Sequence, residues 1–305
     1  MNFENKWGFI DKSGRVAVLL QFEEVYSESE EKAAVKLGNE WGFVNMKNQL
    51  IVNPRYEAVK SYSQNRAAVC IQNMWGYLDE NGKMVIKLQY QDARSFMHNM
   101  AAVKMNSYWG FIDRKGVTIA TPAFENVRDF SENKAAVQYA GLWGYIDTKG
   151  KLIIAPQFEY ADDFYENRAA VSDQGKWGFI DQNGRFVIQP QFENAQHFSS
   201  GVAAIQKGGY WGLVNSTGKI TIIPQYDELM PCSKNGVLFA KKDEKWGLVD
   251  RNGRTILRPV FDEAFNFEDG LAPVSINGYW GLIDRRGRWV VEPTYVNQVS
   301  TVDED

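Results

Sequence analysis

The chain has 305 residues, and 34 Lys and Arg against 38 Asp and Glu give it a formal net charge of −4. This balance gives no general support for binding nucleic acid, which needs a concentrated basic patch. With only two cysteines and two histidines, a disulfide framework, a cysteine metal cluster, most zinc sites and most histidine-dependent catalysis are disfavoured.

The amino-terminal residues 1–7 lack the basic region and apolar core of a secretion signal. No stretch approaches 18 uninterrupted apolar residues, so the sequence predicts no membrane span. We therefore expect a protein of the reducing cytoplasm, with no metal and no cofactor.

Trp-Gly pairs recur along the whole chain. Seven of the eight spacings between them are 34 residues and one is 35. The pairs begin at Trp7, Trp41, Trp75, Trp109, Trp143, Trp177, Trp211, Trp246 and Trp280. This regularity predicts one domain, a single array of nine repeats over residues 1–305. We expect the one extra residue in the polar segment 241–245, because insertions in turns cost least.

Each repeat is predicted to hold three strands and a short irregular or fourth strand. In the clearest copy, a strand over 177–181 starts at the Trp-Gly pair and ends at Asp181. Gly184 follows three residues later, which predicts a turn that ends in a left-handed residue and is capped by the aspartate. A second strand over 186–190 is expected to end at Pro190, because proline cannot extend the ladder of hydrogen bonds.

Two further aromatic columns follow in each repeat. A ring stands two residues after the proline position in all nine repeats: Phe22, Tyr56, Tyr90, Phe124, Phe158, Phe192, Tyr226, Phe261 and Tyr295. A stretch such as 195–198 then ends in Phe in five repeats, and a small apolar strand such as 169–171 follows. Since one repeat cannot bury its own rings, we expect stacked repeats to share a continuous core that contains the Trp, the ring and the later Phe.

The pattern Lys-Trp-Gly-Phe-Ile-Asp-x-x-Gly, then Val-Ile-x-Pro-x-Phe, then Phe-x-x-Asn-x-Ala-Ala-Val, resembles the WG-repeat (KWG-repeat) family, best known from bacteria. Residues 176–205 show it most cleanly, and the resemblance covers essentially the whole chain. The seventh repeat departs from it, with Cys232 at the Phe position and Val237-Leu238-Phe239 for Ala-Ala-Val. The resemblance implies a β-rich repeat and no particular reaction.

Two all-β architectures fit this repeat. One is a set of tandem β-hairpin repeats stacked in an open superhelical or solenoid-like array. The other is a β-propeller with one repeat per blade. There are nine Trp-Gly strands and only eight small apolar strands of the Ala-Ala-Val type, which would leave one blade of a closed ring incomplete and favours the open array.

Residues suited to catalysis show no shared site in the sequence. His98 and His197 occupy different positions in their repeats, and Cys70 and Cys232 are expected to be buried apolar groups. The carboxylates recur in columns, which favours turn capping and surface charge over a single acid–base pair. A basic column on the turns is expected to be a solvated surface: Arg15, Lys83, Lys151, Arg185, Lys219, Arg254 and Arg288. We expect no catalytic residues and no enzyme activity.

The residue before each Trp varies from Lys and Glu to Tyr, so this position must reach solvent. Exposed Tyr and Met are enriched where proteins bind. The predicted binding residues are the apolar members of this position: Tyr108, Tyr210, Tyr279, Met74 and Leu142.

Repeat arrays present long surfaces whose variable positions set specificity. The sequence thus favours a non-enzymatic scaffold that mediates protein–protein interaction with an unidentified protein partner. The alternative is binding of a carbohydrate or cell-wall glycan by exposed aromatic rings. Tyr stands before the Trp in only three of the nine repeats, and not in consecutive ones, which favours the protein partner.

Overall fold

The structure is a computed structural model that describes residues 2–3, 5–11 and 13–295. Every regular element among these residues is a β-strand, and the strands form antiparallel sheets, none of which closes into a barrel. The predicted all-β fold of tandem hairpin repeats is confirmed. Internal contacts divide the chain into unit 1, Met1–Gln157, and unit 2, Phe158–Asp305. A single array over residues 1–305 stays a prediction.

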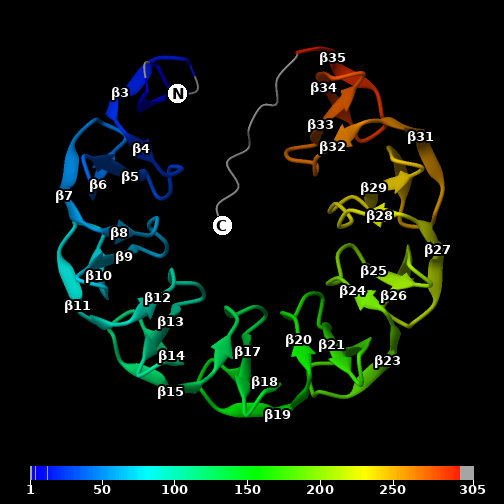
Figure 1. Cartoon of the computed structure of the whole chain (residues 1–305), viewed down its shortest axis with the longest axis horizontal. Coiled ribbons are helices and arrows are strands. Elements are labelled where there is room, and N and C mark those ends of the chain that lie inside the picture. Colours follow the sequence, from blue (N-terminus) through cyan, green and yellow to red (C-terminus); the bar gives the residue numbers. More distant parts are fainter. Residues whose placement is uncertain (1, 4, 12, 296–305) are drawn as a thin grey trace. The chain divides into compact units, whose positions relative to one another are not determined.

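Unit 1 contains one three-stranded sheet and four four-stranded sheets in the described part of the chain (Figure 1). The first holds β1 (Asn2–Phe3), β2 (Lys6–Ile10) and β3 (Val16–Phe22). The second and third hold β4 (Glu24–Val25), β5 (Lys32–Leu37), β6 (Glu40–Asn45) and β7 (Leu50–Tyr56), then β8 (Ala58–Val59), β9 (Arg66–Ile71), β10 (Met74–Asp79) and β11 (Met84–Tyr90). The last two hold β12 (Asp92–Ala93), β13 (Met100–Met105), β14 (Tyr108–Asp113) and β15 (Thr118–Phe124), then β16 (Asn126–Val127), β17 (Lys134–Tyr139), β18 (Leu142–Asp147) and β19 (Leu152–Phe158).

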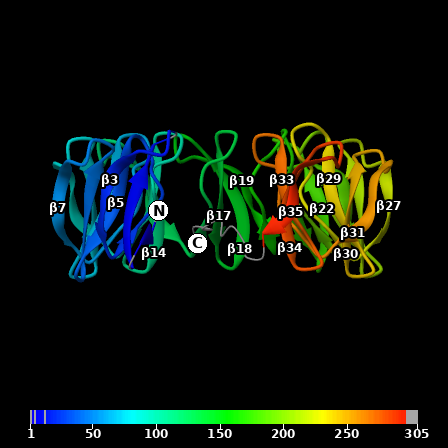
Figure 2. The ribbon, with the colours of Figure 1, turned by 90° about the horizontal axis from the view of Figure 1, so that it is seen from above.

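Unit 2 repeats the same four-stranded sheet. Its first two sheets hold β20 (Tyr160–Ala161), β21 (Ala169–Asp173), β22 (Lys176–Ile180) and β23 (Phe186–Phe192), then β24 (Asn194–Ala195), β25 (Val202–Lys207), β26 (Tyr210–Asn215) and β27 (Ile220–Tyr226). The next two hold β28 (Glu228–Leu229), β29 (Val237–Lys242), β30 (Lys245–Asp250) and β31 (Thr255–Phe261), then β32 (Glu263–Ala264), β33 (Leu271–Ile276), β34 (Tyr279–Asp284) and β35 (Trp289–Tyr295). In the view of Figure 2, the strands of each unit run vertically between turns at their upper and lower ends.

Each four-stranded sheet joins the end of one sequence repeat to the start of the next. In the sheet β4–β7, the short strand and the small apolar strand precede Trp41, and the Trp-Gly strand and the long strand follow it. In the first sheet, the two-residue strand β1 pairs with β2 through Asn2 and Trp7, where other sheets place a small apolar strand. The described strands therefore match the predicted count of nine Trp-Gly strands and eight small apolar ones.

The glycine of each Trp-Gly pair faces a bulge in the long edge strand. In the sheet β4–β7, Trp41 pairs with Tyr56 and Phe43 with Val52, so three residues oppose Gly42 alone. A Cβ on Gly42 would lie 2.4 Å from the Val52 carbonyl oxygen and 2.7 Å from the Pro54 nitrogen, which only glycine avoids. The expectation that the strand ends at the proline is wrong, because this bulge absorbs the missing N–H and the strand continues to the ring.

The Asp-x-x-Gly turn has the predicted geometry. The Asp79 carboxylate accepts hydrogen bonds from the backbone N–H groups of Asn81 and Lys83, at 3.0 and 2.9 Å. Gly82 donates to the Asp79 carbonyl oxygen and has a φ of 78°. Asn48, which replaces the glycine in one repeat, has a φ of 62°, as expected for the residue that tolerates this region next best.

The core consists of layers between successive sheets within a unit. On β5, Ala34 belongs to the layer shared with β8–β11, whereas Val35 belongs to the layer shared with the first sheet. In four of the layers two rings meet edge to face, as where Phe43 contacts Tyr62 with ring centroids 4.9 Å apart. The predicted sharing of rings between stacked repeats is thus observed within each unit.

The Trp column lies at the margin of these layers. Five members are buried and four are half-buried; the buried ones are Trp41, Trp109, Trp143, Trp246 and Trp280. Cationic side chains cover ring faces at this margin, as where the Arg94 guanidinium lies 5.0 Å from the Trp109 ring centroid. Such contacts add an electrostatic attraction to the packing.

The extra residue lies at a different turn from the one expected. β29 and β30 keep the register and two-residue turn of β25 and β26. Instead, the turn before β29 is longer: Ser233 and Val237 pair across three residues, whereas Ser199 and Val202 pair across two. The strand that replaces Ala-Ala-Val is therefore Leu238-Phe239-Ala240, because Phe239 pairs with Leu248 as Ala204 pairs with Leu213.

Candidate functional site

The variable position before each Trp lies at the tip of a hairpin. We call the hairpin rim the paired residues that flank the turn between each small apolar strand and the following Trp-Gly strand. In unit 1 these include the pairs Leu37–Glu40, Ile71–Met74, Met105–Tyr108 and Tyr139–Leu142. In unit 2 they include Asp173–Lys176, Lys207–Tyr210, Lys242–Lys245 and Ile276–Tyr279. Because all the four-stranded sheets share this strand register, each of them carries one variable pair at its hairpin tip.

A carboxylate that directly precedes the first strand of the same sheet holds each of several tips in place. The Glu125 carboxylate accepts from the Gly141 N–H at 2.9 Å, and Glu193 accepts from Gly208 and Gly209 at 3.0 and 2.8 Å. The bonds from Gly209 and Gly208 hold the pKa of Glu193 below its usual value. This acidic column therefore caps turns, one of the two roles expected from the sequence, and it fixes the tip backbone before any partner binds.

Four of the five predicted binding residues are exposed. Tyr108, Tyr210 and Tyr279 are each about half exposed, at 47%, 51% and 48%, and Leu142 is 40% exposed. Met74 is less exposed than expected: its side chain is half-buried, beside the half-buried Ile71 with which it pairs.

The structure brings some of these residues near one another along the rim. Met74, Tyr108 and Leu142 occupy the same position on three successive sheets of unit 1. In unit 2, Tyr210 and Tyr279 are separated by the sheet β28–β31, whose tip carries Lys245. The apolar part of the rim is thus most continuous in unit 1.

Sequence reasoning missed two exposed apolar groups. Tyr139 pairs with Leu142 and is 55% exposed. It lies on β17 after the buried Ala-Ala-Val residues, so its exposure was not expected. The sequence signal for that exposure was its position across the turn from the variable residue Leu142. The long edge strands also carry exposed apolar side chains, with Ile223 at 73%. The bulges and prolines on those strands oppose pairing with another strand.

The groups most suited to catalysis are dispersed. His98 is exposed, and His197 packs against Tyr165 with ring centroids 4.3 Å apart and the rings tilted by 34°. Both thiols are buried, and burial raises the pKa of Cys70 and raises the pKa of Cys232 to about 11, so neither is a ready thiolate. The described residues include no group of three or more His, Cys, Asp and Glu side chains placed to hold a metal. No helix in the same part of the chain is long and apolar enough to cross a membrane.

Comparison with known proteins identifies the repeat. The profile of one family, described as WG containing repeat, matches residues 7–41, 41–75, 75–109, 109–143, 143–177, 177–211, 211–246, 246–280 and 280–297. No curated protein matches the chain significantly.

Solved structures resemble the fold at low sequence identity. One described as the crystal structure of the eukaryotic initiation factor has 10% identity and a TM-score of 0.60, over 93% of this chain and 92% of that one. The dihydro-heme d1 dehydrogenase NirN has 14% identity and a TM-score of 0.44, over 83% and 70%. Hsv2p of Kluyveromyces lactis has 9% identity and a TM-score of 0.44, over 74% and 91%. At these identities, the first likeness bears on the fold alone.

Proposed function

Since the chain belongs to the family of WG containing repeats, we propose that it is a non-enzymatic scaffold whose hairpin rim binds a protein partner. One observation carries the proposal: variable Tyr and Leu side chains are exposed at hairpin tips whose backbone is fixed by a side-chain cap, from a carboxylate beside Leu142 and Tyr210 and from the Gln91 amide oxygen beside Tyr108. Tyr offers a large contact area at a small loss of side-chain entropy, which suits an interface anchor.

The chemistry of the rim supports a protein over a glycan. In unit 1, Tyr108 is followed on the next sheet by the pair Tyr139 and Leu142, so an aliphatic side chain lies beside the rings. In unit 2, Lys245 lies on the sheet between Tyr210 and Tyr279. A sugar chain is better served by rings repeated at one position, whereas mixed apolar and charged tips suit a protein surface.

The absence of catalysis is part of the same proposal. The recurring carboxylates are engaged in turns, as in the caps by Asp79 and Glu193, and the two buried thiols, whose pKa is raised, suit a packing role.

Free cysteines are also typical of a reducing compartment, so we propose that the protein is cytoplasmic. Cell fractionation tests that location, and recovery with a membrane or extracellular fraction would contradict it.

Photo-crosslinking tests the rim directly. A photoreactive amino acid is placed at position 142 and, as a matched control, at the exposed Gln182 on the Asp-x-x-Gly turn of another sheet. In a lysate of the cells that make the protein, we expect one discrete protein adduct from position 142 and none from position 182. The same adduct from both positions, or no adduct from the rim, would contradict the proposal. Binding of insoluble polysaccharide that is lost on Tyr108→Ala would favour the glycan alternative.

A further inference from the structure

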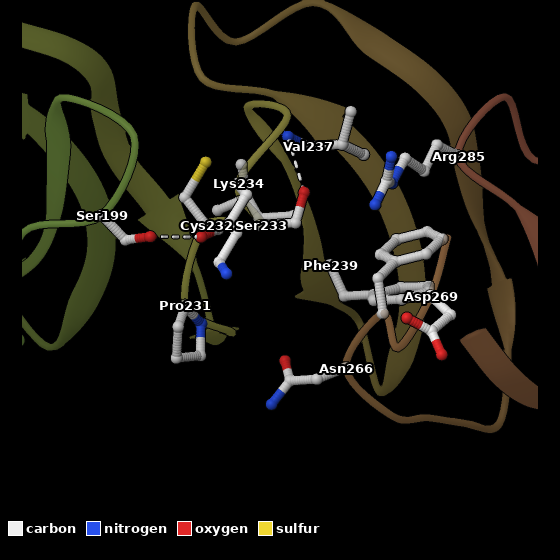
Figure 3. A pocket seen from close by; sticks show the side chains of 12 residues that line it. Ser199, Pro231, Cys232, Ser233, Lys234, Val237, Phe239, Asn266, Asp269 and Arg285 are labelled. Carbon is white, nitrogen blue, oxygen red and sulfur yellow. Dashed lines mark hydrogen bonds between the residues drawn. The ribbon is translucent and has the colours of Figure 1, made fainter. Parts of the chain in front are cut away.

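The repeat that departs most from the pattern borders a cavity. The longer turn before β29 and the replacement of the usual Phe by Cys232 occur next to each other, in the segment 231–237. This segment, with residues from the following sheet, lines a cavity of about 380 Å³ within unit 2 (Figure 3). Ligand cavities for small molecules begin at roughly this size.

The inner wall of the cavity is apolar and well ordered by packing. Leu238 and Phe239 are about 1% exposed, and Phe239 stacks on the half-buried Phe267 with ring centroids 5.3 Å apart. The backbone beside this wall is also fixed, since the Ser199 hydroxyl donates to the Cys232 carbonyl oxygen at 2.6 Å. A preformed apolar wall lowers the entropic cost of binding an apolar group.

Charged side chains surround the apolar wall. Lys234 and Asp269 are exposed and Arg285 is half-buried, so the formal charge of the lining is +1 in a chain of net charge −4. The Asn235 side-chain amide lies against the Arg285 guanidinium. Within the described residues, no ion pair closer than 4 Å joins Asp269 to Arg285 or to Lys234. Two cations around an apolar wall suit a carboxylate that carries an apolar group.

We propose that this cavity binds a carboxylate attached to a compact apolar group. Lys234 and Arg285 pair with the carboxylate, and the apolar group lies against Phe267 and Phe239. Two sources share this chemistry: a free small acid, or the carboxyl-terminal residue of another protein chain. The site is independent of the hairpin rim.

Calorimetric titration with 3-phenylpropionate and with its uncharged amide tests the ligand class. We expect saturable binding of the acid, and binding of the amide at least tenfold weaker, because the amide lacks the charge that both cations recognise. No saturable binding of the acid, or equal binding of the two compounds, would overturn the proposal.

Variants expected to change the affinity for the acid in opposite directions test which side chains of the lining bind the carboxylate. Arg285→Gln and Lys234→Gln should each weaken binding of the acid at least threefold, whereas Asp269→Asn should tighten it by removing a repulsion. Arg286→Gln, next to Arg285 but outside the lining, is the control and should leave affinity unchanged. Lys234 is an exposed side chain, so its variant tests the proposal even if Arg285→Gln unfolds. Unchanged affinity in Lys234→Gln, or weaker binding in Asp269→Asn, would contradict the assignment.

Peptides distinguish the two sources. A hexapeptide that ends in Phe is titrated with a free and with an amidated carboxyl terminus. Tighter binding of the free-acid peptide than of 3-phenylpropionate would identify a chain terminus as the ligand, and exclusion of the peptide while the small acid binds would identify a free acid. Either result retains the proposed chemistry, whereas equal binding of both peptides would overturn it.

Discussion

Phe239 stacks nearly parallel to Phe267, with ring centroids 5.3 Å apart and an interplanar angle of 14°. Four other layers place an edge-to-face pair here instead, as between Phe179 and Phe198 at 64°. The difference follows from the sizes of two side chains that pair across neighbouring strands: the larger ring lies on the other strand of the pair in this sheet. Most sheets pair an alanine with a ring, such as Ala170 with Phe179, whereas Phe239 pairs with Leu248.

This exchange predicts a rescue. Phe239→Ala should lower the free energy of unfolding by about 3–5 kcal/mol, because it opens a cavity in a buried layer. Leu248→Phe alone should cost about 1–3 kcal/mol by overpacking. The double variant restores the alanine–ring pair of the other sheets and should be more stable than Phe239→Ala. Urea unfolding of the four proteins measures the coupling, and purely additive effects would show that the two side chains do not share one space.

The bulge opposite each Trp-Gly pair predicts that alanine substitution lowers stability by very different amounts at two glycines of one hairpin. A Cβ on Gly144 would lie 2.4 Å from the Ile154 carbonyl oxygen and 2.7 Å from the Pro156 nitrogen. Gly141 has a φ of 79° with open space around it. Gly141→Ala should therefore cost only the backbone strain of about 1–2 kcal/mol, and Gly144→Ala about 3 kcal/mol because backbone must move. Thermal unfolding compares them, and equal losses would contradict the steric account.

The aspartate turns predict a loss of stability in acid. Hydrogen bonds from the Arg185 and Asn183 backbone hold the pKa of Asp181 below its usual value of 3.8. A carboxyl whose pKa is lower in the folded state stabilises the fold above its unfolded pKa, and this contribution is lost as the pH falls through the folded pKa. The melting temperature should thus decrease as the pH falls below about 4.

Asparagine provides the matched variant. Asn45 and Asn215 already hold this position in other repeats and accept the same backbone hydrogen bonds. Asp181→Asn should therefore keep the turn while removing one titrating group, so its melting temperature should approach that of the natural protein as the pH falls. A constant difference between the two at all pH values from 2 to 6 would contradict the role given to the charge.

The repeat, the aspartate turns and the ring columns could be predicted because each depends on residues close in sequence. The bulge could not, since it arises only when Pro54 and Gly42 are brought together by strand pairing. The extra residue was misplaced for a similar reason. Segments 233–237 and 241–245 are both polar turns, and only the register of Phe239 with Leu248 distinguishes them.

The candidate site was predictable in part. Variation before the Trp indicated solvent at Tyr108 and Leu142, and both are exposed. Tyr139 was missed because it belongs to the strand whose other residues are core, and its exposure follows from its place beside the turn. The acidic caps beneath the tips join residues 15–16 positions apart, which sequence columns alone do not connect.

Binding and unfolding of a rim variant test the central claim most directly. The changes Tyr108→Ala, Tyr210→Ala and Tyr279→Ala are combined, and affinity for the crosslinked partner is measured beside thermal unfolding, with Ile223→Ala on an edge strand as the exposed apolar control. Each single Tyr change should cost roughly 1 kcal/mol of binding and the triple change far more, while stability stays within about 0.5 kcal/mol for each change and the control binds normally. A triple variant that keeps full affinity, or that unfolds early, would contradict the assignment of these tyrosines to a binding rim.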